Sequence, residues 1–182
     1  MPAEESACRE RLTRLGVKYE PLPPIVDGAC GSPWPLRVTV LSDGLALAPS
    51  IVTDCPVAEA LARWSLESAA PAANRELGGH PSRMTIGTSY ECRSQNRQAG
   101  AKLSEHAFAD AVDVMGFDLQ NRKTFQVRPL AAEAPEGRFL ATIRADACRY
   151  FTTVLGPGSD PSHENHLNLD LRKRSRDMRL CQ

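Results

Sequence analysis

The chain has 182 residues, with 22 Lys and Arg balanced by 22 Asp and Glu. This length can bury one proper core, so we expect a single domain over residues 1–182. A formal net charge of zero gives no reason to expect a nucleic-acid partner or a membrane surface. No apolar run reaches the roughly 18 residues that a membrane span needs, so no span is predicted.

The N-terminal part predicts one short helix and an irregular connection. Apolar residues recur at helical spacing over residues 4–15, and Gly16 follows as a stop signal. Residues 20–35 are rich in proline and glycine, which predicts a fixed but irregular segment.

A hairpin and a helix are predicted next. Residues 36–41 alternate between apolar and polar side chains, and the turn residues 42–44 lead into a second strand at 45–47. A helix is expected to begin at Pro56, which suits a first helical turn, and to bend or end at Pro71.

The second half of the chain reads as further strands around one long helix. Alternating or β-rich segments predict strands over residues 83–88, 111–117, 124–127 and 166–171. Inward-facing apolar residues predict a helix over about 136–155.

These elements predict an α+β domain with a small antiparallel sheet and two main flanking helices. Its core would be residues 36–171, preceded by the helix and connection of residues 1–35. The basic segment 172–182 is expected to lie in solvent, because charge runs at a terminus usually do.

Six cysteines are spread along the chain without a C-x-x-C pair. Metal-binding cysteines come in close pairs, whereas an even number of dispersed cysteines predicts three disulfides in an oxidising compartment. Six buried thiols in a cytosolic protein are the alternative, and sequence alone does not choose a pairing. The first five residues are acidic and polar, unlike a signal peptide, so a secreted or periplasmic location implies that the leader is absent from this sequence.

Three of the four histidines fall in two segments that also hold carboxylates. His106 and Asp113 are seven residues apart, and His163 lies just before a predicted strand that His166 begins. A catalytic zinc site needs three protein ligands and one open position. Because alternate strand residues share a face, Asp113 could lie beside His166 or Asn168 on a neighbouring strand. A lone histidine is usually structural, and it is the clustering that favours a metal site.

Particular motifs resemble those of known zinc peptidases. Residues 104–106 with 111–114 look like the SxH…AxD motif of D-Ala-D-Ala metallopeptidases and related phage endolysin peptidases, and Arg93 sits where those enzymes carry a substrate arginine. Over most of its length the chain is similar to the extensin-like C-terminal domain family, a bacterial branch of that superfamily. The stretches that carry this second resemblance are Cys8–Val17, Cys55–Trp64, Ser89–Arg93, Ser104–Phe108 and Ala147–Pro157.

The last motif departs from that family. Its usual form is H-x-D-H-F-H-L-D, and Asn165 and Asn168 stand where the family has aspartate and histidine. By analogy with the peptidases, position 168 would carry the third zinc ligand. His166, two residues away on the same strand face, is the other candidate for that ligand.

The resemblance therefore implies a secreted zinc peptidase-like domain of D-Ala-D-Ala metallopeptidase-like fold, acting on peptidoglycan peptide crosslinks. His106, Asp113 and His166 would hold Zn²⁺, with Asn168 at the alternative third position. His163 and His166 would be the catalytic residues, with His163 acting as a base or as an oxyanion partner. Arg93 would bind a substrate carboxylate, unless it forms only a structural salt bridge beside a disulfide. The second interpretation is a degenerate peptidase fold that binds cell-wall peptide or a protein partner without cleavage.

Overall fold

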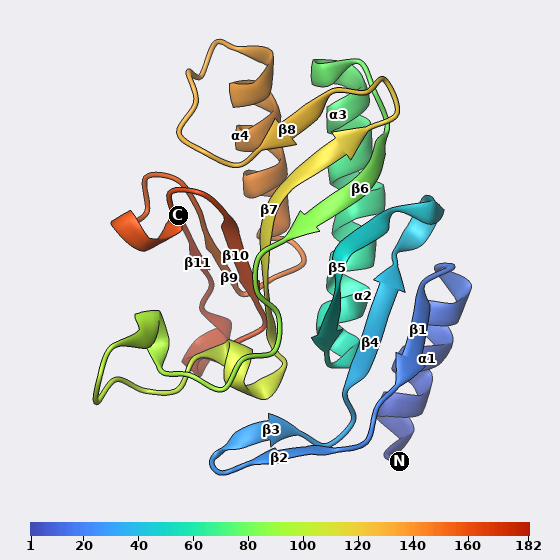
Figure 1. Cartoon of the computed structure of the whole chain (residues 1–182), viewed down its shortest axis with the longest axis vertical. Helices are drawn as coiled ribbons and strands as arrows, with labels where there is room; N and C mark the ends of the chain where they lie inside the picture. The colour runs from blue at the N-terminus through green and yellow to red at the C-terminus, as the bar shows by residue number, and fades with distance from the viewer.

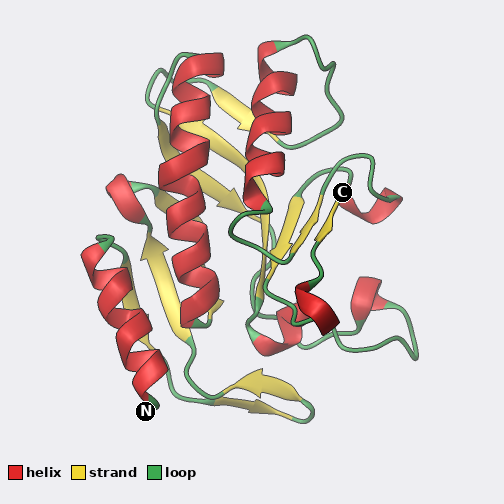
Figure 2. Ribbon diagram, turned by 180° about the vertical axis from the view of Figure 1, so that it is seen from behind, coloured by secondary structure: helices red, strands yellow, loops and turns green.

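The computed structural model describes all residues, 1–182, as one α+β unit built on a nine-stranded sheet. The strand order is β1-β4-β5-β6-β7-β10-β9-β11, with β8 paired to β7, and a separate hairpin joins β2 to β3. Figures 1 and 2 show the main helices together on one face of the sheet. The strands are β1 Lys18–Pro21, β2 Ile25–Asp27, β3 Cys30–Ser32, β4 Leu36–Val40, β5 Ala46–Thr53, β6 Pro81–Ile86, β7 Ala111–Leu119, β8 Thr124–Gln126, β9 Thr153–Leu155, β10 Leu167–Asp170 and β11 Leu180–Cys181.

The predicted α+β class is confirmed, but the sheet is neither small nor purely antiparallel. Strands β5 and β6 run parallel, as do β9 and β11. Several of the added strands are two to four residues long, for example β1, β9 and β11. Such short segments show too few alternations for a sequence pattern to reveal them, and long-range pairing supplies the missing constraint.

Three helical bodies flank the sheet, namely the two expected main helices and the short N-terminal helix that the sequence also predicts. The first is α1 Ala3–Arg14, and the last is α4 Pro135–Ala147. The middle one is continuous through α2 Cys55–Trp64, a π-helical turn Ser65–Ala69 and α3 Ala70–Leu77.

The middle helix continues through Pro71 and does not end there. A proline inside a helix lacks an N–H and crowds the carbonyl of the preceding turn. Here the turn before it is widened, and the Ala70 N–H donates to the Ser65 carbonyl five residues back. The widened turn accommodates Pro71, and the helix continues to Leu77, where Gly78 closes it at a positive φ of 68°.

Helix α4 is shorter than the predicted 136–155 helix. It ends at Ala147, and residues 153–155 form β9. The β-branched run Thr152, Thr153 and Val154 favours a strand, and Phe151 is fully buried without belonging to the helix.

The core lies between the sheet and these helices. The Trp64 indole on α2 donates to the carbonyl of Ile143 on α4 at 2.8 Å. Phe139 of α4 stacks edge-on against Phe117 and Phe125 of the sheet, with ring centroids 5.9 and 4.7 Å away. These contacts fix the helices against the sheet.

Both terminal segments are more ordered than predicted. The connection 20–35 contains the β2–β3 hairpin, and β1 pairs with β4 at the sheet edge. The segment 172–182 contains β11, which pairs with β9. None of the helices is long and apolar enough to cross a membrane.

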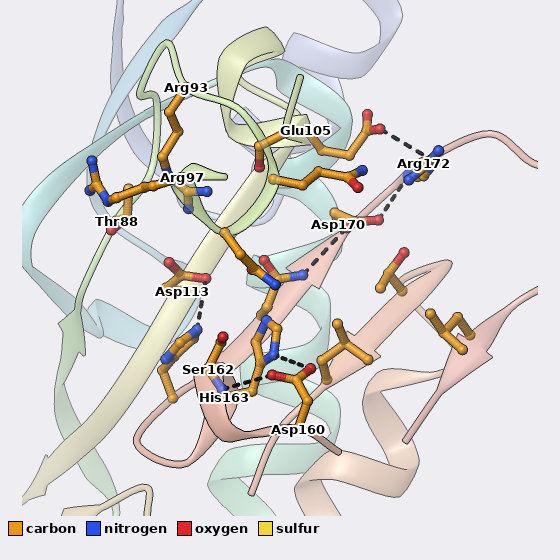
Figure 3. A pocket seen from close by; sticks show the side chains of 18 of the residues that line it. Thr88, Arg93, Arg97, Glu105, Asp113, Asp160, Ser162, His163, Asp170 and Arg172 are labelled. Atoms are coloured by element: carbon orange, nitrogen blue, oxygen red, sulfur yellow. Dashed lines mark hydrogen bonds and ion pairs between the residues drawn. The ribbon is translucent and has the colours of Figure 1, made fainter. Parts of the chain in front are cut away.

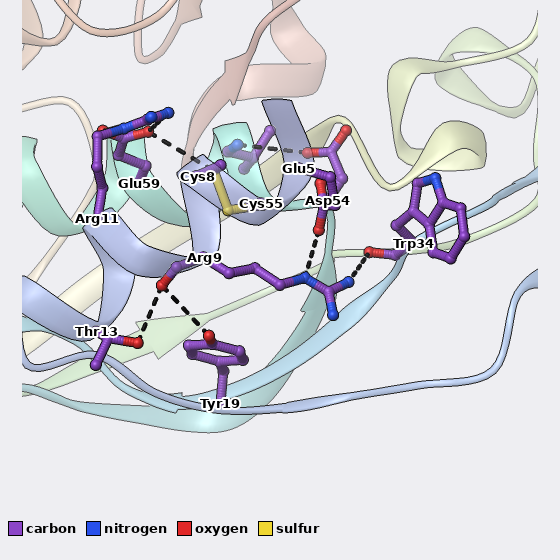
Figure 4. The surroundings of a disulfide bond; sticks show 11 residues. Glu5, Cys8, Arg9, Arg11, Thr13, Tyr19, Trp34, Asp54, Cys55 and Glu59 are labelled. Carbon is purple, nitrogen blue, oxygen red and sulfur yellow. Dashed lines mark hydrogen bonds and ion pairs between the residues drawn. A yellow bond between two sulfur atoms is a disulfide. The ribbon is translucent and has the colours of Figure 1, made fainter. Parts of the chain in front are cut away.

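Three disulfides pair all six cysteines, as the sequence predicts. Cys8–Cys55 links α1 to the start of α2, where Arg11 also pairs with Glu59 at 2.7 Å (Figure 4). Cys30–Cys92 links the β2–β3 hairpin to the segment before Arg93. Cys148–Cys181 links the end of α4 to β11.

Thiol titration tests this framework. We expect the unfolded, unreduced protein to show no free thiol, and reduction to lower the free energy of unfolding by about 2–4 kcal/mol per bridge, because each bridge closes a long loop in the unfolded chain. Denaturant unfolding with and without reductant measures the change. Six reactive thiols in the oxidised protein would contradict both the pairing and an oxidising compartment.

Candidate functional site

A polar cavity of about 450 Å³ opens beside β7 and β10 (Figure 3). Of its 19 lining residues only two are hydrophobic, so an apolar ligand has little to contact there. Five of the six residues that the sequence singles out line the cavity, and the sixth, His106, is buried behind the lining; Arg93, Asp113 and His163 are three of the five. His166 and Asn168 line it as well.

Antiparallel pairing of β7 with β10 sets the floor of the cavity. Asn168 lies directly opposite Asp113 in the register. Because alternate strand residues share a face, Asp170 projects on the same side as Asn168. This confirms the expectation that neighbouring strands bring position 168 beside Asp113.

His106 reaches the same floor from the short turn Glu105–Phe108. Its ring is 1% exposed, and Nδ1 lies 2.6 Å from the Ser89 carbonyl oxygen. A carbonyl only accepts, so Nδ1 carries a hydrogen. Nε2 then faces two oxygens, Oδ1 of Asn168 at 3.2 Å and Oδ1 of Asp113 at 3.3 Å.

The amide of Asn168 is oriented by its own neighbour. Its Nδ2 donates to Oδ2 of Asp170 at 3.3 Å. A carboxylate oxygen requires a donor, so the amide oxygen is the atom turned towards His106.

His166 approaches Asp113 from the end of the preceding loop. Its Nδ1 lies 2.9 Å from Oδ1 of Asn165, and its Nε2 lies 3.6 Å from Oδ1 of Asp113. With Nδ1 donating to Asn165, the lone pair on Nε2 points at the carboxylate.

Two histidine nitrogens therefore face the Asp113 carboxylate. Asp113 is 6% exposed, and its Oδ1 has no hydrogen-bond donor. A buried charged oxygen without a partner is costly, so the site needs either a proton or a cation. No group of three or more His, Cys, Asp and Glu side chains is arranged to hold a metal ion. The strand position opposite Asp113 is occupied by an amide, Asn168, rather than by a further imidazole.

Without a metal ion, a proton on His106 compensates the negative charge of Asp113. Burial lowers the pKa of His106, but the adjacent Asp113 carboxylate outweighs burial and raises that pKa above its ordinary value. Burial raises the pKa of Asp113, yet His106 and then His166 lower it overall. Burial and the neighbouring histidines lower the pKa of His166, even though Asp113 opposes them, so its neutral form is favoured.

His163 is held by a residue that the sequence analysis did not identify. Its Nδ1 lies 2.7 Å from Oδ2 of Asp160, whose Oδ1 accepts the Ser162 backbone N–H at 2.7 Å. The His163 ring lies 5.1 Å from that of His166, centroid to centroid. The Asp-Pro-Ser sequence before His163 is a capping pattern that could have pointed to Asp160.

Arg93 carries a salt bridge and also lines the cavity. Its Nε lies 2.9 Å from Glu91, and Arg97 pairs with the same carboxylate at 2.7 Å. One glutamate thus faces two guanidinium groups. The neighbouring Cys92 is tied to Cys30, which anchors this segment.

The fold and site define a disulfide-linked α+β domain whose polar cavity centres on a histidine, an aspartate and an asparagine. The family described as extensin-like protein C-terminus matches residues 6–182, and the chain belongs to it. Comparisons with curated proteins and with solved structures found no match.

Two half-buried acids near this site have no cation in ion-pair contact. Burial raises the pKa of Asp110 to about 8, helped by neighbouring carboxylates, and burial raises the pKa of Asp54 to about 7. Asp54 caps α2 by accepting the Val57 N–H at 3.4 Å. Asp110 directly precedes β7 and makes no side-chain hydrogen bond of this kind.

These raised pKa values predict that stability falls as pH rises. The folded state holds a proton on Asp110 that the unfolded state releases above about pH 4, so the free energy of unfolding declines between about pH 4 and pH 8. Asp110→Asn should flatten this decline by more than about 1.4 kcal/mol, the equivalent of one pKa unit.

Denaturant unfolding at pH 5 and pH 8 measures the effect. Asp177→Asn, at an exposed position, is the matched control and should follow the wild type. Equal pH dependence in Asp110→Asn and the wild type would contradict the prediction.

Proposed function

We propose that this domain is a secreted zinc peptidase that acts on peptide crosslinks of the bacterial cell wall, with His106, Asp113 and His166 as the metal ligands. The observation that carries the proposal is the convergence of two histidine Nε2 atoms on the buried, unpaired Oδ1 of Asp113. The SxH…AxD motif supports the same chemistry, and the three disulfides are compatible with a secreted or periplasmic protein.

The donor types suit zinc, although the three side chains are not arranged as a complete metal site in this structure and would have to move closer together to share an ion. Both Nδ1 atoms are tied to oxygen acceptors, Ser89 for His106 and Asn165 for His166, which is how metal-binding histidines are normally oriented. An amide oxygen is a poorer zinc donor than imidazole, so we assign the third ligand position to His166 rather than to Asn168. When bound in such a site, zinc polarises a water and the scissile carbonyl.

The surrounding residues supply the rest of a hydrolytic site. His163, oriented by Asp160, lines the cavity and can accept and return a proton. Arg93 is placed to bind a peptide carboxylate, because it shares Glu91 with Arg97 and so leaves positive charge for a ligand. The cavity of about 450 Å³ suits a short peptide.

One observation favours a second candidate function, a module that binds cell-wall peptide or a protein partner without cleaving it. Asn168 lies opposite Asp113, at the position where the resemblance expects a ligand histidine. Asn165 likewise replaces an expected aspartate and instead accepts a hydrogen bond from His166.

Zinc titration by calorimetry tests the ligand set. If position 168 is the third-ligand position, the wild type should bind zinc weakly, and Asn168→His should raise the affinity at least about tenfold because it supplies an imidazole. If His166 is the third ligand, as we propose, the wild type should bind zinc tightly, and His106→Ala and His166→Ala should each abolish binding. Asn168→Ala should change the affinity little.

His80→Ala is the control, since His80 pairs with Asp43 at 2.9 Å outside the cavity lining. Zinc affinity that survives both His106→Ala and His166→Ala would rule out this metal site.

A digest of purified peptidoglycan, followed by separation of the released muropeptides, tests the hydrolysis. We expect new amino termini from the wild type with zinc, and about 10²–10⁴-fold slower release from His163→Ala, because proton transfer is lost. Asp160→Asn should slow release less and shift its pH profile, because it changes only the orientation and charge around His163.

The double change Asn165→Asp with Asn168→His should raise activity. If this variant cleaves and the wild type does not, the binding-module function is the correct one for the natural chain. If neither cleaves while both bind zinc, the peptidase proposal fails.

A further inference from the structure

The segment that follows β10 extends one wall of the cavity. Strand alternation places Asn168 and Asp170 on the cavity face, and Arg172 and Arg174 continue the same alternation. All four line the cavity, whereas Lys173 between them is exposed and does not. The basic segment predicted to lie in solvent therefore contributes to the site.

Arg174 is held in place without a carboxylate partner. Its Nη1 donates to the Thr152 carbonyl at 3.1 Å, and its Nη2 donates to Oγ1 of Thr153 at 2.7 Å. Both acceptors are neutral, and Arg174 forms no ion pair. Its positive charge is thus fixed at the cavity wall and lacks a counter-ion.

Arg172 lies beside it with one loose partner. Its Nε is 3.6 Å from Oε1 of Glu105. The other nearby acid, Asp170, already accepts from the Asn168 amide and from the Arg172 backbone N–H. Arg174 is therefore the guanidinium on this wall that lacks a counter-ion, and Arg172 beside it has only one distant carboxylate partner.

The wall is anchored at both ends. Strand β10 pairs with β7 and β9, and β11 pairs with β9 beyond the two arginines. The disulfide Cys148–Cys181 closes the segment onto the end of α4. Figure 3 shows Arg172 on a different side of the cavity from Arg93 and Arg97, with Asp113 on the floor.

We propose that Arg172 and Arg174 form a second anion subsite, so that the ligand of this cavity is an acidic peptide. One carboxylate of that peptide binds at Arg174, and its C-terminal carboxylate binds at Arg93. Guanidinium groups bind carboxylates through paired N–H donors, and two such groups on separate walls select for the spacing of two acids. The assignment of the C-terminal carboxylate rests on the proposed function, whereas the Arg174 subsite does not.

Matched peptides test the subsite by calorimetry. The probes are acetylated tetra-alanine peptides in which one alanine, at each position in turn, is glutamate or glutamine. We expect one position at which glutamate binds the wild type at least about tenfold more tightly than glutamine. Arg174→Gln should abolish that preference, and Arg172→Gln should reduce it.

Lys173→Gln is the control, because it removes the intervening positive charge from the exposed face. The control should keep the preference. If no position shows a preference in the wild type, or if folded Arg172→Gln and Arg174→Gln both retain it, the subsite is wrong. Thermal melts establish whether each variant is folded. If Arg174→Gln is not folded, Arg172→Gln alone is used to test the subsite.

The same titrations separate this inference from the proposed function. Replacing the peptide C-terminal carboxylate by an amide tests Arg93, and Arg93→Gln should remove the resulting difference. If Arg93→Gln leaves the carboxylate-to-amide difference unchanged while Arg174→Gln abolishes the glutamate preference, the cavity still binds acidic peptides. The C-terminal carboxylate would then not bind at Arg93, and the peptide orientation assumed for a peptidase would be wrong. Since binding is measured, absence of hydrolysis does not bear on the second subsite.

Discussion

The pairing of β7 with β10 is the constraint on which the site depends. Leu167 and Leu169 of β10 are fully buried on the core side, so burial of apolar surface fixes which face of the strand turns inward. A slip of one residue would bury Asn168 and expose both leucines. The register that the core requires is thus the register that sets Asn168 opposite Asp113. Packing energy, rather than any interaction within the cavity, holds these polar groups together.

That arrangement leaves the negative charge of Asp113 without a compensating partner. Its buried Oδ1 meets two histidine nitrogens and no donor, and an unpaired buried charge costs several kcal/mol. A proton shared with His106 relieves part of this cost and removes that nitrogen's lone pair. A cation relieves it while keeping both histidines neutral. The two solutions compete, so metal binding and protonation of His106 should oppose each other.

The polar residues of the site could largely be predicted from the sequence, whereas many of the strands, disulfides and helix ends that hold them in place could not. The seven-residue spacing of His106 and Asp113 and the alternation through Asn168 predicted neighbours that the structure places within 3.3 Å. Both signals are local. The parallel pairing of β5 with β6, the cysteine pairing and the end of α4 depend on residues far apart in the chain. Asp160 was overlooked because its signature is that of a helix cap, and only the fold aims it at His163.

The basic segment 172–182 shows why the expectation of a solvated charge run fails when contacts with distant parts of the chain order the segment. A run of arginines is usually solvated because nothing repays the cost of ordering long charged side chains. Here β11 and the Cys148–Cys181 bridge already order the backbone, so little further entropy is lost when Arg174 settles on Thr152 and Thr153. Cys181 was the signal that this segment is anchored. Anchoring turns an otherwise mobile charge into a fixed one, and a fixed charge beside the polar floor of the cavity can discriminate between ligands.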